Sequence, residues 1–141
     1  MVNRNKGSVR YFSAFLCLFF ISVAIIGQRN NKAGTLAGEK IYLGKCASCH
    51  GKDGLGKGKR IPPLANSDYL ENNLNESIRG VLFGQQGEIM VNGVRYDKRM
   101  RAIKLTDQEV ADVMNYVRNS WGNQENDLVT IEQVARIRKK K

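Results

Sequence analysis

The chain has 141 residues, of which 42% are hydrophobic and 26% charged, with 14 glycines and 2 prolines. This composition indicates one globular domain and excludes a long disordered chain. The formal net charge is +10, and the 3 cysteines, an odd number, exclude a disulfide-rich scaffold.

The first 27 residues have the layout of an export segment. Residues 1–10 carry three positive side chains and no negative one, and residues 11–27 carry no charge. As a helix, the uncharged run spans about 25 Å, slightly less than the roughly 30 Å hydrocarbon core of a bilayer. A signal peptide cleaved near Ala24 and a retained membrane anchor both fit, and a buried core helix is disfavoured because the run has no polar face. Both favoured interpretations place the rest of the chain outside the cytoplasm.

After the export segment, the sequence predicts a linker, then short helices separated by long loops. Helices are predicted where apolar side chains recur behind a candidate N-cap: 36–45 behind Thr35, 67–73 behind Ser67, 75–83 behind Asn75 and 107–121 behind Thr106. The linker covers residues 28–35, and the glycine-rich loops cover 51–63 and 84–105. A further short helix is predicted over 131–137. The basic run from Arg138 to Lys141 is expected to be a solvated tail or to contact anionic lipid.

The helix predicted over 107–121 has the clearest pattern. Thr106 and Glu109 form a capping box, and Gly122 is a stop signal. The apolar side chains on its stripe are Val110, Val113, Met114, Val117 and Trp121. No segment alternates as a strand would, so the fold is predicted as all-α, with a domain over 36–123 and a basic C-terminal extension over 124–141. Long loops in so small a domain need something large to wrap around.

The segment Cys46-Ala47-Ser48-Cys49-His50 matches C-x-x-C-H, the attachment pattern of haem c. Two thioether bonds fix the porphyrin edge to the backbone, and the histidine then projects its imidazole toward the iron. The chain has 1 histidine in total. The pattern therefore predicts one covalently bound haem c, held by Cys46 and Cys49, with His50 as an axial iron ligand.

Two other chemistries use the same residue types. A structural zinc site needs about four ligands, and this cluster supplies three with no second cluster elsewhere. A redox-active dithiol needs a thioredoxin-like βαβ setting, which the predicted elements do not offer. Export favours haem, because haem c is attached on that side of the membrane, and the zinc and dithiol interpretations stay as alternatives.

Beyond this motif, the chain resembles the single-haem, class I type bacterial cytochromes c over roughly residues 33–122. The matching segments are Gly38 to Tyr42 before CASCHG, PPLANSDYL at 62–70, VNGVRYDKRM at 91–100 and LTDQEVADVMNYVRNSWGN at 105–123. The resemblance implies a cytochrome c-like fold wrapped around one haem, with the first and last helices crossing closely at Gly38 and Tyr116. The last segment is similar to cytochrome subunits or domains that accompany periplasmic oxidoreductases, including copper nitrite reductases and alcohol dehydrogenases.

The resemblance also implies a sixth iron ligand, a methionine in the loop before the last helix. Met100 matches this position, and Met90 is the alternative, whereas Met114 lies on the apolar stripe and is expected in the core. Where the family usually has a proline after this methionine, the chain has Arg101. Coordination by histidine and methionine raises the haem potential.

A second family feature is a proline after C-x-x-C-H whose carbonyl accepts the other ring N–H of the histidine. Pro62 or Pro63 matches it. Such a contact fixes the tautomer of a ligating histidine and raises its basicity. Alternatively, both prolines only shape a turn.

Basic side chains are frequent near both segments that are predicted to contact the haem. They are Lys52, Lys57, Lys59 and Arg60 after the motif, and Lys98, Arg99 and Arg101 around Met100. This charge favours an acidic-surfaced redox partner, such as a reductase, dehydrogenase or oxidase, over a merely solubilising surface. Nucleic acid is disfavoured, because the chain is predicted to be exported and has no recognition motif.

The predicted function is electron transfer rather than catalysis, on the periplasmic side of the bacterial inner membrane, with the chain tethered or soluble after signal cleavage. With both axial positions filled, oxygen and peroxide have no open place on the iron. The alternatives are a small peroxidase-like haem enzyme with Met100 unbound, and a haem-free dithiol redox protein.

Overall fold

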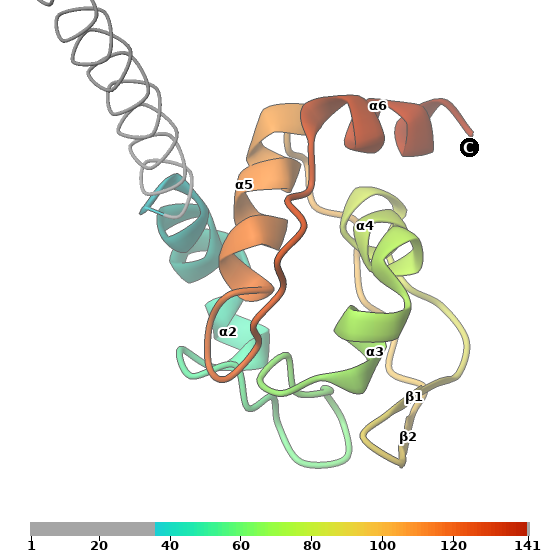
Figure 1. Cartoon of the computed structure of the whole chain (residues 1–141). Coiled ribbons are helices and arrows are strands. Elements are labelled where there is room, and N and C mark those ends of the chain that lie inside the picture. Colours follow the sequence, from blue (N-terminus) through green and yellow to red (C-terminus); the bar gives the residue numbers. More distant parts are fainter. Residues whose placement is uncertain (1–35, 141) are drawn as a thin grey trace, which may run out of the picture. The chain divides into compact units, whose positions relative to one another are not determined.

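The computed structural model of the protein describes residues 36–140 (Figure 1). The predicted export segment, the linker and the Thr35 cap lie outside the described residues. The elements are a helix over 36–45, α2 (Ala47–His50), α3 (Asp68–Asn72), α4 (Leu74–Phe83), β1 (Ile89–Val91), β2 (Val94–Tyr96), α5 (Asp107–Val117) and α6 (Ile131–Lys139). The predicted helical fold is confirmed, with one small addition described below. Within residues 36–140, no helix is long and apolar enough to cross a membrane.

The addition is a two-stranded hairpin inside the segment 84–105, which was expected to be irregular. Strands β1 and β2 pair antiparallel, with Met90 opposite Arg95. Their turn is Asn92-Gly93, and both residues have positive φ, 51° and 74°. Asn-Gly with two positive φ values is the favoured composition of a tight hairpin turn. The dipeptide is therefore a sequence signal for this hairpin. The alternation that would identify the strands is too short to recognise, because each strand has only three residues.

The helix caps follow the sequence in two of three cases. The Ser67 side chain accepts a hydrogen bond from the Leu70 backbone N–H at 3.4 Å and so begins α3. Thr106 and Glu109 form the predicted capping box at the start of α5. The prediction for Asn75 is wrong, because α4 begins at Leu74 and no side chain caps it.

Helix α5 ends four residues earlier than predicted, at Val117. Trp121 has a φ of 52°, in the left-handed region that a helix cannot contain. Its ring packs instead on Tyr42 and Tyr116, with ring centroids at 4.8 and 5.5 Å. Trp121 therefore belongs to a turn, although its spacing fits the apolar stripe.

The core lies where α4, α5 and α6 pack against one another, and the helix over 36–45 crosses α5. At that crossing, a Cβ on Gly38 would lie 2.7 Å from the Tyr116 Cβ and would collide with the Asp112 carbonyl oxygen. The close approach expected at Gly38 and Tyr116 is therefore present. The largest fully buried side chains are Tyr42, Ile78, Val91, Val110 and Val134.

The C-terminal segment is part of this core. Val134 and Ile137 of α6 are buried in the same cluster as the apolar side chains of α5. The Arg138 Nε donates to Asp107 Oδ1 at 2.6 Å, and its other nitrogen donates to the Leu105 carbonyl at 2.9 Å. The expectation of a solvated tail from residue 138 is thus wrong for Arg138. In Figure 1, α6 lies at one end of the domain, and the loop after α2 and the hairpin lie at the other.

Candidate functional site

The C-x-x-C-H segment forms one helical turn. The backbone N–H groups of Cys49 and His50 both donate to the Cys46 carbonyl, at 3.0 and 2.9 Å. Residues three apart lie on one side of a helix, so the two thiols share a side. Both are free, with Cys46 half-buried and Cys49 exposed. This arrangement can present two sulfur atoms to a single planar group.

The His50 imidazole is held by one backbone contact. Its side chain is only 9% exposed, and Nδ1 lies 3.1 Å from the Pro62 carbonyl oxygen. Of the two candidate prolines, the structure therefore brings Pro62 to the histidine, not Pro63. Because Nδ1–H donates to that oxygen, Nε2 is the unprotonated nitrogen, and it has no hydrogen-bond partner among residues 36–140. Burial lowers the pKa of His50, against the opposing effect of Pro62, which favours the neutral form that binds metals.

A tightly folded loop returns the chain from His50 to Pro62. The Gly56 N–H donates to the His50 carbonyl at 2.8 Å, and the Lys57 N–H donates to the Ile61 carbonyl at 3.0 Å. Gly56 has a φ of 71°, and a Cβ there would lie 2.7 Å from the carbonyl carbon of Pro62. Only glycine combines this conformation with this contact, so Gly56 sets the Pro62 position. In the sequence, it is one of four glycines in the predicted loop 51–63.

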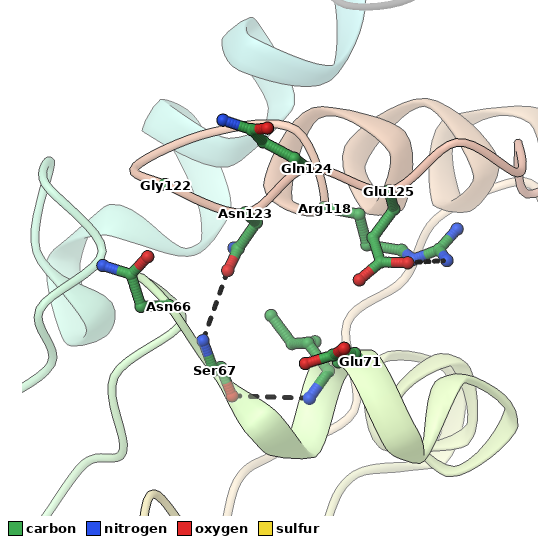
Figure 2. A pocket seen from close by; sticks show the side chains of 9 residues that line it. Asn66, Ser67, Glu71, Arg118, Gly122, Asn123, Gln124 and Glu125 are labelled. Carbon is green, nitrogen blue, oxygen red and sulfur yellow. Dashed lines mark hydrogen bonds and ion pairs between the residues drawn. The ribbon is translucent and has the colours of Figure 1, made fainter.

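A second positioning residue, Asn123, ties the segment after Pro62 to the end of α5. Its Nδ2 donates to the Leu64 and Val117 carbonyls at 2.7 and 2.8 Å, and its Oδ1 accepts from the Ser67 N–H at 3.2 Å (Figure 2). Leu64 and Ser67 lie more than fifty residues away in sequence. No local pattern announced this role.

A polar cavity of about 290 Å³ lies beside Asn123, and Figure 2 shows the residues that line it. Its lining includes Glu71, Glu125 and the buried Arg118, but none of the residues predicted to hold a cofactor. Arg118 donates to the Asp127 carbonyl at 2.7 Å and forms ion pairs with Glu125 and Asp127. This cavity therefore borders the ion pairs and hydrogen bond by which Arg118 holds the segment between α5 and α6 in place.

Met100 lies in a loop that is fixed through its backbone. The Met100 N–H donates to the Gln85 carbonyl at 2.9 Å, and the Gln85 N–H donates back at 3.1 Å. Behind it, Gly84 has a φ of 86°, and a Cβ there would lie 2.7 Å from the Met100 carbonyl oxygen. These contacts restrain the loop at the point where the family usually has a proline after the methionine and this chain has Arg101. The Met100 side chain is half-buried.

The other two candidate methionines are placed differently. Met90 is 52% exposed on β1, and Met114 is 3% exposed on α5, as its place on the apolar stripe predicted. Among these three, Met100 alone combines a loop position with partial shielding.

The basic residues around the site are exposed. Within residues 36–140, the ion-paired arginines are Arg79, Arg95, Arg118 and Arg138. The cations near the two segments that form no ion pair in this described part of the chain are Lys52, Lys57, Lys59, Arg60, Lys98, Arg99 and Arg101. Lys57 instead donates to the Ser48 carbonyl, between the two cysteines, at 2.7 Å. Positive charge therefore reaches the attachment motif itself.

The geometry disfavours both rival chemistries. Among the described residues, no three histidine, cysteine or acidic side chains come together as a metal site, so zinc has no adequate ligand set there. Burial, and then the neighbouring Cys49, raise the pKa of Cys46 to about 11. Redox-active dithiols need a lowered thiol pKa, so Cys46 has the opposite environment.

Comparisons with known proteins identify relatives of this chain. The sequence profile "Cytochrome c" matches residues 36–121. Cytochrome c-552 of Thermus thermophilus is 35% identical over 113 residues, which cover 74% of this chain and 86% of that protein.

Two further relatives are subunits of larger enzymes. The cytochrome c subunit of the quinone alcohol dehydrogenase of Gluconobacter oxydans is 34% identical over 113 residues, covering 77% of this chain and 23% of that subunit. The gluconate 2-dehydrogenase cytochrome c subunit of Pantoea cypripedii is 36% identical over 107 residues, covering 72% of this chain and 24% of the subunit. This chain thus spans about a quarter of these two subunits.

Proposed function

This chain belongs to the cytochrome c family, and from that premise we propose that it carries single electrons through one haem c with His50 and Met100 as axial ligands. The family and its relatives support electron transfer in general. The number of haems, the ligand pair, the location and the partner are our proposals.

The observation that carries the proposal is the held imidazole of His50. With Nδ1 bonded to Pro62, Nε2 is free to bind iron, and the thiols of Cys46 and Cys49 lie on one side of the preceding turn. These residues fit the group: the two cysteines would form the thioether bonds, and His50 would be the axial ligand. When bound, haem c supplies an iron that takes up and releases one electron.

Met100 is the sixth ligand we propose. Its backbone hydrogen bonds with Gln85 fix the loop. Its thioether is half-buried and has no polar partner among residues 36–140, so binding iron would break no existing contact. A methionine opposite a histidine raises the potential of a haem. With both positions occupied, neither oxygen nor peroxide finds an open coordination site, so we propose a carrier rather than a peroxidase-like enzyme.

For the partner, we propose an acidic-surfaced oxidoreductase in the periplasm. Cations without an ion pair among residues 36–140 lie on the loop 51–63 that follows the motif, and Lys57 reaches the carbonyl between the cysteines. Such charge steers an acidic surface toward the motif and makes association dependent on salt. The dehydrogenase subunits among the relatives support an oxidoreductase partner. The apolar segment 11–27 supports export, with the chain tethered or released after cleavage.

The absorption spectrum of the exported, purified protein tests the proposal. We expect the reduced α-band of haem c, one haem per chain after denaturation, and a weak far-red band from methionine bound to ferric iron. Ready binding of carbon monoxide to the reduced protein would contradict a filled sixth position. A protein without covalent haem would exclude both the carrier and the peroxidase-like alternative.

A further inference from the structure

A second group of cations lies on α6, away from the motif. Residues 131–140 contain one acidic side chain, Glu132, and four basic ones. Arg138 is ion-paired with Asp107. The remaining three, Arg136, Lys139 and Lys140, are exposed and form no ion pair within residues 36–140. We refer to these three residues as the basic face of α6.

Packing fixes the direction of this face. Val134 and Ile137 are 0% and 9% exposed against the core, so α6 cannot turn without exposing them. Arg136 lies three residues from Lys139, and such residues share one side of a helix; Lys140 follows directly after the helix. Glu132 lies on the same side, where Arg136 contributes to its lowered pKa after the larger effects of its own backbone and Thr130. The three cations outnumber this single acid.

Helix stabilisation does not account for the whole group. Cations in the last turn interact favourably with the helix dipole, but the effect falls off within that turn. Lys140 follows the last residue of α6, and Lys141 extends the run in the sequence. The positive charge of Lys140 and Lys141, beyond the end of α6, is better explained by an interaction with a negatively charged surface.

Helix α6 and the loop 51–63 lie at opposite ends of the domain (Figure 1). One flat surface cannot contact both ends. Since the loop end is proposed to meet the redox partner, the α6 end needs a different negative surface. The uncharged run 11–27, behind a basic terminus, brings the chain to a bilayer as signal or anchor.

We propose that the basic face of α6 binds anionic phospholipid headgroups and turns the C-x-x-C-H motif and the loop 51–63 that follows it away from the bilayer. Leu128, three residues before α6, and Ile131, its first residue, are 49% and 42% exposed and add apolar contact with the interface. The inference rests on the proposed export of the chain. Its consequence is a fixed orientation, with the cations of the motif facing the aqueous phase.

Lysine acetylation of the full chain in nanodiscs tests this orientation. The discs contain phosphatidylcholine, with or without a third of phosphatidylglycerol, and mass spectrometry follows acetylation of each lysine. With phosphatidylglycerol, we expect acetylation of Lys139 and Lys140 to slow roughly fivefold or more. Lys52 and Lys59, at the opposite end, should react equally in both discs. If the released form is isolated instead, it is added to the same discs.

A matched pair of variants separates a specific surface from net charge. Arg136→Gln leaves both reporter lysines in place and should reduce their protection several-fold, since each cation near an anionic surface contributes roughly fivefold to binding. Arg60→Gln removes the same charge at the loop end and should leave protection unchanged.

Three outcomes would overturn the inference: equal acetylation in both discs, protection of Lys52 and Lys59 instead, or equal losses in the two variants. The absorption spectrum of the same samples is read in parallel. Unprotected lysines with an intact haem spectrum would reject the membrane surface alone. Protected lysines without covalent haem would reject only the carrier proposal.

Discussion

The two regions that present the proposed iron ligands are built in different ways. His50 lies in a helical turn, and the following loop returns to hold its ring through the Pro62 carbonyl. Met100 lies in an extended segment that backbone hydrogen bonds fix, between Met100 and Gln85 and from Ile103 to Val81, with its side chain half-buried. The chain therefore holds the histidine ring itself, on a rigid histidine side, whereas the methionine side chain is positioned through its backbone and can adjust. Changes on the first should abolish cofactor binding, and changes on the second should retune it.

The largest expected effect is at His50. His50→Ala removes the axial nitrogen that Pro62 orients, so the yield of exported protein with covalent haem should fall roughly tenfold or more, as measured by the reduced α-band per unit of protein. Ser48→Ala is the matched control inside the motif, because its side chain is exposed. An unchanged α-band in the His50 variant would contradict the rigid histidine side.

Met100→Ala should retain the haem but lose the far-red band. Its potential should drop by a sizeable part of the about 0.8 V that axial ligands control, because the thioether no longer stabilises ferrous iron. Redox titration and the ferric spectrum measure both changes. Met90→Ala is the control, since this side chain is 52% exposed on the hairpin. If the far-red band disappeared in the Met90 variant instead, the assignment would move to Met90.

Gly56→Ala tests how rigid the histidine side is. The added Cβ would meet the Pro62 carbonyl group at a φ of 71°, so we expect the free energy of unfolding to fall by about 3 kcal/mol. Gly58→Ala has a φ of 53° but open space around it, and should cost about 1 kcal/mol. The difference in the free energy of unfolding between the two variants, measured by denaturant, isolates the steric effect of the added Cβ. Equal losses of stability in both variants would mean that the close contact with Pro62 is not essential.

A smaller effect is expected at the hairpin of the methionine side. The Asp68 carboxylate accepts from the Asn92 N–H at 2.7 Å, and the Asn92 side chain accepts from the Asp68 N–H at 3.0 Å. Asp68→Ala should cost about 1 kcal/mol and speed hydrogen exchange of the hairpin amides. Asp97→Ala, an exposed neighbour of β2, should leave exchange unchanged. Equal exchange in both variants would show that α3 does not restrain the hairpin.

The smallest effect concerns the capping box that begins α5, next to the loop of Met100. Hydrogen bonds from Thr106 lower the pKa of Glu109 below its ordinary value of 4.5. A lowered pKa stabilises the fold above pH 4.5 and loses this contribution as the pH falls through the folded-state value. Glu109→Gln should thus be slightly less stable than the parent at pH 7, and the difference should vanish in acid. A difference that grew on acidification would contradict this linkage.

The proposed chemistry of the rigid histidine side could be predicted from the sequence alone, as could the helices that carry it. One helical turn is enough to bring Cys46, Cys49 and His50 together. The capping box of Thr106 and Glu109 likewise lies within four residues. Local hydrogen bonds and periodicity decide such features, so they can be read directly. The close crossing at Gly38 was available through resemblance, because the contact itself joins distant segments.

The contacts that span many residues could be found only in the folded domain. The fold brings Pro62 rather than Pro63 to His50 through the close turn at Gly56, places Asn123 to hold the segment after that proline, and turns Arg138 inward to Asp107. It also moved Trp121 from the predicted helix into the aromatic cluster. In each case the two partners lie far apart in the sequence, so no local spacing pattern predicts the contact. Packing in the folded domain selects one contact among several that the local sequence permits.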